Sequence, residues 1–247
     1  MTLPQPLLKL DQLRRHRAGR PAVERLSLAL DRGEILGLLG VNGAGKSTTL
    51  SMIAGALRPD SGTIELGGKN FLEMPELAQK AIGWLPERAP LWQELTVHEH
   101  LRTHAQLRGL RSAALTQACD AVIQRLELTP LLRRLAGVLS QGQRQRLGLA
   151  CALIHSPDVL VLDEPANALD PVQVASLRKV IREEAARGAA VILSTHLLAE
   201  VTAICTRVAI LHEGHLRHDG AVPAGDHTAL EQTFFDIAMH GAGAQAA

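Results

Sequence analysis

The sequence has no tyrosine, two tryptophans and three phenylalanines, so aromatic residues make up only 2% of its 247 positions. Its cysteines are few, far apart and odd in number, which excludes a disulfide framework and is typical of a reducing compartment. No apolar run approaches the roughly 18 residues of a membrane-spanning helix, and the N-terminus lacks the basic start of a secretory signal. With 26 basic and 25 acidic residues, no charge excess directs the chain to nucleic acid or to an anionic membrane. These absences predict a soluble cytosolic protein that recognises its partners locally.

Short apolar runs typical of strands recur along the chain, and helical patterns follow several of them. These runs span residues 34–40, 63–66, 81–85, 159–164, 189–195 and 207–214. Such alternation predicts an α/β fold with a mostly parallel central sheet. No similar run occurs between about residues 96 and 152, where Leu115, Cys119, Val122, Ile123 and Leu126 share one helical face. The sequence therefore predicts an all-helical lobe inserted into the α/β core.

The string GVNGAGKST, residues 40–48, follows the first apolar run and opens a helix, as a phosphate-binding P-loop does. Its glycines permit a tight turn whose backbone N–H groups point at phosphate, and the helix N-terminus favours negative charge. Lys46 is placed for the β- and γ-phosphates, Ser47 for Mg²⁺ and Thr48 for the α-phosphate. The predicted nucleotide-binding residues of this loop are Gly40, Asn42, Gly43, Ala44, Gly45, Lys46, Ser47 and Thr48.

A second chemical signal is VLVLDEPANALD, residues 159–170, in which four apolar residues lead to two carboxylates. A buried parallel strand delivers such groups to its C-terminal end, where ligands bind in open α/β sheets. Asp163 is then suited to hold Mg²⁺, and Glu164 to polarise the water that attacks the γ-phosphate. The alternative is that both carboxylates form a solvated strand end.

The P-loop, LSQGQ at 139–143, VLVLDEP, NALD at 167–170 and STH at 194–196 occur in a characteristic order. In order and approximate spacing they resemble the ATP-binding subunit of an ABC transporter, from about Leu8 to Asp219. The LSxGQ signature is the specific element, since many ATPases share the P-loop. The resemblance implies a P-loop fold with an N-terminal antiparallel β subdomain and an inserted helical subdomain, with ATP and Mg²⁺ as cofactors.

As a single cassette over residues 1–247, the chain divides into three parts by this resemblance. Residues 1–86 and 155–222 form the α/β core with its β subdomain, and residues 87–154 form the helical subdomain. Residues 223–247 form a C-terminal extension, whose last residues, HGAGAQAA, are expected to be a frayed tail.

In this family two cassettes face each other head to tail, and the signature of one closes over the ATP of the other. The resemblance therefore assigns Ser140, Gln141, Gly142 and Gln143 to ATP bound by a second cassette, identical or a close paralogue. The alternative is that Ser140 simply caps a helix whose Gln and Arg side chains are solvated. Glu164 resembles the catalytic base and Asp170 the D-loop acid. His196 resembles the switch histidine, although a histidine after a strand can also be an ordinary surface residue.

Three positions depart from the family pattern. Glu87 stands where glutamine is common, and its carboxylate could still hold Mg²⁺ or its water. Gln141 stands where glycine is usual in the signature. The position that usually stacks an aromatic ring on adenine is matched by Arg17, with His16 beside it.

The pairing of LPE at 85–87 with LSxGxRQR resembles the ATPases of ABC-2-type exporters. This implies a cytoplasmic subunit on the inner face of the cell membrane, attached to a separate permease. Leu91 and Trp92 lie where the family receives the permease, either as an exposed apolar anchor or packed within the helical lobe. Two alternative functions are open. The chain could be a soluble ABC ATPase that acts on ribosomes or chromosomes, or a regulatory cassette that binds ATP without hydrolysing it.

Overall fold

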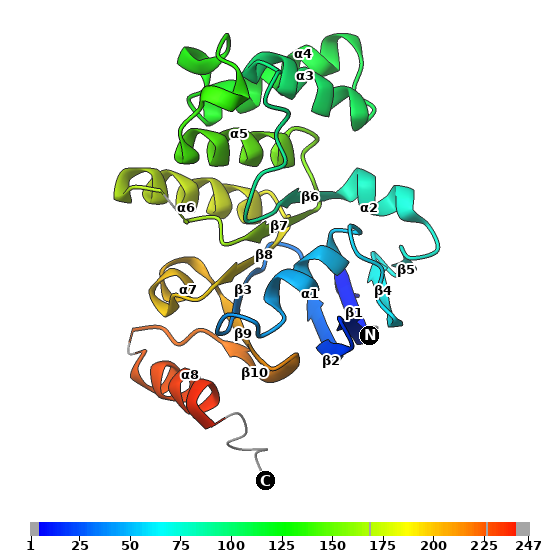
Figure 1. The fold of residues 1–247 in the computed structure, drawn as a ribbon, viewed down its shortest axis with the longest axis vertical. Coiled ribbons are helices and arrows are strands. Elements are labelled where there is room, and N and C mark those ends of the chain that lie inside the picture. The colour runs from blue at the N-terminus through cyan, green and yellow to red at the C-terminus, as the bar shows by residue number, and fades with distance from the viewer. Residues whose placement is uncertain (1–4, 168, 226, 241–247) are drawn as a thin grey trace.

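The computed structural model describes residues 5–167, 169–225 and 227–240. Two sheets form the lower part of the molecule in Figure 1, and a group of helices stands above them. The tail predicted for residues 240–247 lies outside the described residues, apart from the helical backbone of His240.

The larger sheet has six strands in the order β10-β9-β3-β8-β7-β6. All neighbours are parallel except the hairpin of β9 and β10, so the predicted mostly parallel sheet is confirmed. Strands β3, β7 and β8 are buried along their whole length, as expected for strands covered on both faces. Their bounds are Ile35–Leu39 (β3), Ile82–Leu85 (β6), Val159–Asp163 (β7), Ala190–Thr195 (β8), Arg207–His212 (β9) and His215–Ala221 (β10).

The smaller sheet is antiparallel, with the strand order β2-β1-β4-β5, and it matches the predicted N-terminal β subdomain. Helix α1 (Lys46–Ile53) joins it to the larger sheet, because Leu50, Met52 and Ile53 belong to one apolar cluster with residues of both sheets. The bounds of its strands are Leu8–Arg17 (β1), Arg20–Leu30 (β2), Ser61–Leu66 (β4) and Lys69–Asn70 (β5).

The predicted helical insert consists of α3 (Val97–Leu107), α4 (Ser112–Arg125) and α5 (Gln141–Leu153), with 3-10 turns at Thr129–Leu131 and Ala136–Val138. The apolar face predicted for the second of these helices is buried, which confirms that prediction. Thr96 and Glu99 form a capping box at the start of α3. The apolar core of the insert is continuous with one face of the larger sheet.

The remaining helices cover the sheets. They are α2 (Pro75–Ala81), α6 (Pro171–Ala186), α7 (Leu198–Ile204) and α8 (Thr228–His240). Helix α6 lies between the insert and the larger sheet, and α8 lies at the opposite end of the molecule (Figure 1). Among the described helices, none is both long enough and apolar enough to cross a membrane.

The two leucines of α3 test this packing. Leu101 is fully buried and Leu107 is 70% exposed. We expect Leu101→Ala to lower the free energy of unfolding by about 2–5 kcal/mol, because it leaves a cavity in the insert. Leu107→Ala, on the same helix, should change it by less than about 0.5 kcal/mol. Urea unfolding followed by circular dichroism measures both, and equal losses would show that this face of α3 does not pack as described.

Candidate functional site

The loop between β3 and α1 passes so close to its neighbours that two of its residues must be glycine. Gly45, at φ 105°, precedes the first residue of α1, and an added Cβ would lie 2.4 Å from the carbonyl oxygen of Ala22. A Cβ on Gly40 would lie 2.5 Å from the carbonyl oxygen of Leu211. Glycine thus permits the tight turn that leads into α1, and the backbone N–H groups of a helix start favour phosphate.

Lys46 places a buried cation at this loop, and its side chain is only 7% exposed. Its Nζ donates hydrogen bonds to the carbonyl oxygens of Gly40 at 2.7 Å and Val41 at 3.3 Å, and lies 3.9 Å from Glu164 Oε1. Burial lowers the pKa of the Lys46 ammonium, whereas the carboxylates of Glu164, Asp163 and Glu87 raise it, and the net shift is downward. The ammonium thus faces both the loop and the acidic strand end.

Asp163 and Glu164 stand where β7 ends, and Asp163 is buried. Asp163 Oδ1 accepts hydrogen bonds from Ser194 Oγ at 2.6 Å and from Ser47 Oγ at 3.2 Å. Ser194 Oγ also accepts a hydrogen bond at 2.9 Å from the backbone N–H of Glu164, whose φ of 47° is unusual for a residue with a side chain. The alternative of a solvated strand end does not fit Asp163, and Ser194 is a site residue that sequence reasoning missed.

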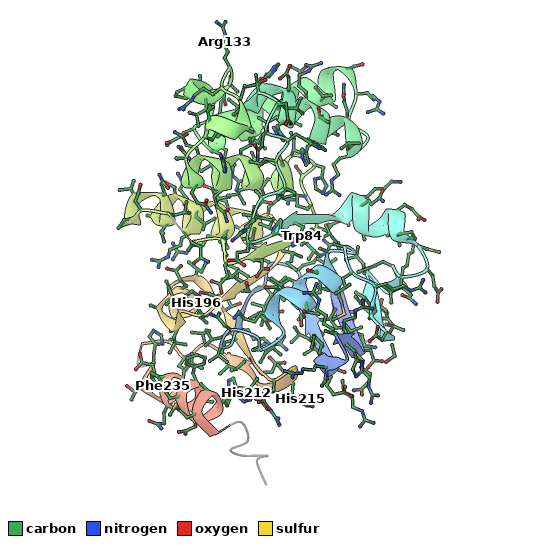
Figure 2. The ribbon with its side chains drawn as sticks, in the orientation of Figure 1. Trp84, Arg133, His196, His212, His215 and Phe235 are labelled. Carbon is green, nitrogen blue, oxygen red and sulfur yellow. The ribbon has the colours of Figure 1, made fainter. Side chains whose placement is uncertain are left out.

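His196 follows β8, which pairs with β7 in the sheet, and its ring contacts the Glu164 carboxylate at the end of β7. Its Nδ1 lies 3.0 Å from Glu164 Oε2 and 3.1 Å from Oε1. In Figure 2 His196 lies on the left of the molecule, where α7 begins, whereas Arg133 projects from the top of the insert. His196 is therefore in contact with the predicted base, unlike an isolated surface histidine.

A cleft of 520 Å³ brings most of the predicted residues together, and its size suits a small ligand. Its lining residues are Arg17, Ala22, Asn42, Gly43, Ala44, Gly45, Lys46, Ser47, Thr48, Glu87, Glu164, Asn167 and His196. Asn167 was not predicted. Arg17 borders the cleft, whereas His16 bonds through Nδ1 and its backbone N–H to Asp60, at 3.2 Å and 2.7 Å.

The signature residues are not part of this cleft. Ser140 is the N-cap of α5: its Oγ accepts from the Gln143 N–H at 3.3 Å, and its own N–H donates to Gln143 Oε1 at 3.0 Å. Gly142 packs closely against α6, since an added Cβ would lie 2.6 Å from Gln173 Oε1. The capping role considered for Ser140 is present, while Ser140 and the exposed Gln141 remain at the surface.

Asp170 starts α6 as its N-cap and accepts a hydrogen bond from the backbone N–H of Gln173 at 2.9 Å. Two arginines further along α6 then bond to α7, the helix that follows His196. Arg178 pairs with Glu200 at 2.9 Å, and Arg182 donates to the Ala203 carbonyl at 2.8 Å. These contacts, which the sequence did not reveal, connect the segment after Asp170 to the segment after His196.

The oxygen ligands that Mg²⁺ prefers are present in the cleft. Ser47 Oγ and Asp163 Oδ1 are 3.2 Å apart, and the Glu87 carboxylate lines the same space. Within the described part of the chain, no three histidine, cysteine, aspartate or glutamate side chains gather to hold a metal by themselves. A magnesium ion here would take its remaining ligands from phosphate oxygens and water, as Mg²⁺ sites commonly do.

The two residues predicted to meet a permease lie in different environments. Leu91 is partly buried and packs against the core of the insert. Trp92 is 46% exposed, and its ring stacks on that of His100 at 5.4 Å between centroids. Leu91 therefore packs within the helical insert, whereas Trp92 presents part of its apolar ring to solvent.

A phosphate-binding loop, a buried lysine, a paired aspartate and a glutamate–histidine contact define a nucleoside triphosphatase of the P-loop class. The family model described as ABC transporter matches residues 23–167. The bacitracin transport ATP-binding protein BcrA of Bacillus licheniformis is 36% identical, over 85% of this chain and 68% of that protein. The ABC-type transporter ATP-binding protein EcsA of Bacillus subtilis (strain 168) is 35% identical, over 82% of each chain.

Among solved structures, the ATP binding subunit of an ABC transporter matches with a TM-score of 0.82 and 31% identity, over 94% of this chain and 95% of that one. The chain therefore belongs to the ABC transporter family, as an ATP-binding subunit with ATPase activity.

Arg17 and His16 can be separated by substitution. We expect Arg17→Ala to raise the Michaelis constant for ATP and for GTP about two- to fivefold with little change in maximal rate, because stacking of a guanidinium on a base contributes roughly 0.5–1 kcal/mol. His16→Ala should change neither constant, since its ring bonds to Asp60. Steady-state kinetics with both nucleotides measures this. A loss confined to His16→Ala, or a strong preference for ATP over GTP, would contradict stacking by Arg17.

Glu87 can be tested against the glutamine that is commoner in the family. Glu87→Gln removes one negative charge from the cleft beside the phosphates, so nucleotide affinity should hold or rise while the dependence on Mg²⁺ shifts. The measurement is ATPase rate against Mg²⁺ concentration for both proteins. Superimposable curves would show that Glu87 does not lie near the metal.

Proposed function

We propose that the chain is the motor subunit of an exporter: it binds ATP with Mg²⁺, hydrolyses it in a pair of cassettes, and drives a separate permease. The observation that carries the proposal is the distribution of its polar residues. Lys46, Ser47, Glu164 and His196 share one cleft, whereas Ser140 and the rest of the signature lie outside it. Each cassette would therefore carry the nucleotide-binding half of one site and the signature half of another.

Hydrolysis at this cleft follows from the roles of its side chains. Lys46 would stabilise negative charge on the β- and γ-phosphates. Ser47, Asp163 and Glu87 would hold Mg²⁺, which would neutralise further phosphate charge. The Glu164 carboxylate accepts a proton from the attacking water. The water oxygen then bonds to the γ-phosphorus, while the bond between that phosphorus and the leaving oxygen of ADP breaks. His196 Nδ1 lies 3.0 Å from Glu164 Oε2. In this mechanism His196 would orient that carboxylate and contact the γ-phosphate.

Pairing supplies the groups that one cassette lacks. The start of α5 presents backbone N–H groups and the Ser140 hydroxyl, and this helix N-terminus favours an anion. We assign Ser140, Gln141, Gly142 and Gln143 to the γ-phosphate bound by the second cassette, identical or a close paralogue. Asp170 connects the paired sites, since its helix α6 contacts both Gly142 and, through Arg178, the helix after His196.

The subdomains have separate roles in this arrangement. Residues 1–86 and 155–222 carry most of the cleft, residues 87–154 carry the signature, and residues 223–247 form an extension. A permease would contact the insert near Trp92, in the segment that joins Glu87 of the cleft to the start of α3. A displacement of the permease against Trp92 would therefore be transmitted to the cleft through the few residues between Trp92 and Glu87.

Export is the direction that we propose, from the pairing of LPE with LSxGxRQR and from the likeness to BcrA, whose name describes bacitracin transport. The permease would hold the subunit at the inner face of the cell membrane. An amphipathic permease segment fits the exposed ring of Trp92, because aromatic side chains at a surface commonly anchor protein contacts.

Glu164→Gln tests both hydrolysis and pairing. The variant keeps its hydrogen-bonding shape but cannot accept the proton, so turnover should fall by about 100-fold or more. Because ATP then persists between the cassettes, the variant should elute as an ATP-dependent dimer in size-exclusion chromatography with light scattering.

The control combines Glu164→Gln with Lys46→Ala, which removes the buried cation and should abolish the dimer. A strictly monomeric profile for Glu164→Gln, at high protein concentration with Mg²⁺-free ATP, would contradict the paired site. Unchanged turnover would contradict the role of Glu164.

A further inference from the structure

A second cavity, of 370 Å³, lies between the helical insert and α6 and shares no lining residue with the nucleotide cleft. The C-terminal end of α4, the middle of α5 and the first three turns of α6 border it, and these helices lie one above another in Figure 1. Its volume is that of a small-molecule site and far exceeds a packing void. The cavity sits at a boundary between two parts of the fold, where ligand sites are common.

Part of the cavity wall is aliphatic, and amide and charged side chains, Glu127 and Glu183 among them, line the rest. Leu126 and Leu149 come from the insert, and Leu177 and Val180 come from α6; all four side chains are buried residues of the core. Such walls favour an apolar body, because covering them removes hydrocarbon surface from water.

Arg146, on α5, also lines the cavity and is a cation without an ion-pair partner in the described part of the chain. Its Nε is buried and has no hydrogen-bond partner, and no ion pair joins it to an acidic side chain in the described part of the chain. The other cations at the cavity are paired: Arg125 with Glu183 and Glu184, and Lys179 with Glu183. The guanidinium stays charged, and because Arg146 is only half-buried, an anion in the cavity would bind its terminal nitrogens rather than the enclosed Nε.

We propose that this cavity binds a small amphipathic anion, with its apolar body on Leu149, Leu177 and Val180 and its single carboxylate or sulfonate on Arg146. One hydrogen bond connects the cavity to the nucleotide cleft. Gln145, which lines the cavity, donates through Nε2 to the carbonyl oxygen of Pro165 at 3.4 Å, and Pro165 directly follows Glu164. The proposal does not depend on the direction of transport or on the permease.

The probe is 1-anilinonaphthalene-8-sulfonate, which joins apolar rings to one sulfonate, titrated into the full chain by calorimetry. We expect one saturable site. Arg146→Gln should weaken binding about tenfold, the effect of losing one charge-assisted hydrogen bond. N-phenyl-1-naphthylamine, which has the same rings without the sulfonate, should bind both proteins with affinities within about twofold of each other.

A matched pair of variants on α6 locates the site. Ser176 lines the cavity and is exposed, so Ser176→Trp fills the space without disturbing the core and should abolish binding. Ala175→Trp, at an exposed neighbouring position outside the lining, should leave binding unchanged. Circular dichroism checks that both variants fold.

Two results would overturn the proposal. One is binding that survives both Ser176→Trp and Arg146→Gln, which would place the probe elsewhere, such as on the exposed Phe235 of α8 (Figure 2). The other is absence of saturable binding to the unsubstituted chain.

Discussion

The buried carboxylate of Asp163 is the group that holds the site together. It accepts hydrogen bonds from Ser47 at the start of α1 and from Ser194 at the end of β8, and thereby joins three segments that are far apart in sequence. A buried carboxylate is stable only with such donors, so the same bonds that satisfy Asp163 also fix the phosphate-binding loop against the sheet. Glu164 and His196 then meet as a consequence of strand pairing.

The cleft contains both a cation and carboxylates, so it suits a ligand that carries both negative and positive charge. Lys46 is the buried cation, and Asp163, Glu164 and Glu87 surround it with carboxylates. Phosphates alone would meet repulsion from these carboxylates, whereas phosphates accompanied by Mg²⁺ would not. This charge distribution supports the proposal that the nucleotide binds together with Mg²⁺.

The insert and the core share one apolar cluster, and a few polar contacts at α6 add to it. Gly142 lies against Gln173, Gln145 reaches the Pro165 carbonyl, and Arg125 pairs with Glu183 and Glu184. Between these contacts lies the cavity that contains Arg146, so the boundary is not tightly packed. At this cavity the insert can adjust against α6 more readily than where the shared apolar core is closely packed.

Local patterns in the chain were enough to define the buried strands of the larger sheet, the phosphate-binding loop and the apolar face of α4, because apolar period and glycine spacing are local signals. They did not reveal β1 or β10 as strands, since charged residues interrupt their apolar positions and bulges shift the register of β1. Tertiary packing alone brought Ser194 to Asp163 and His16 to Asp60, and left Arg146 without an ion-pair partner among the described residues. Those outcomes depend on which distant segments pack together, and no local pattern carries that information.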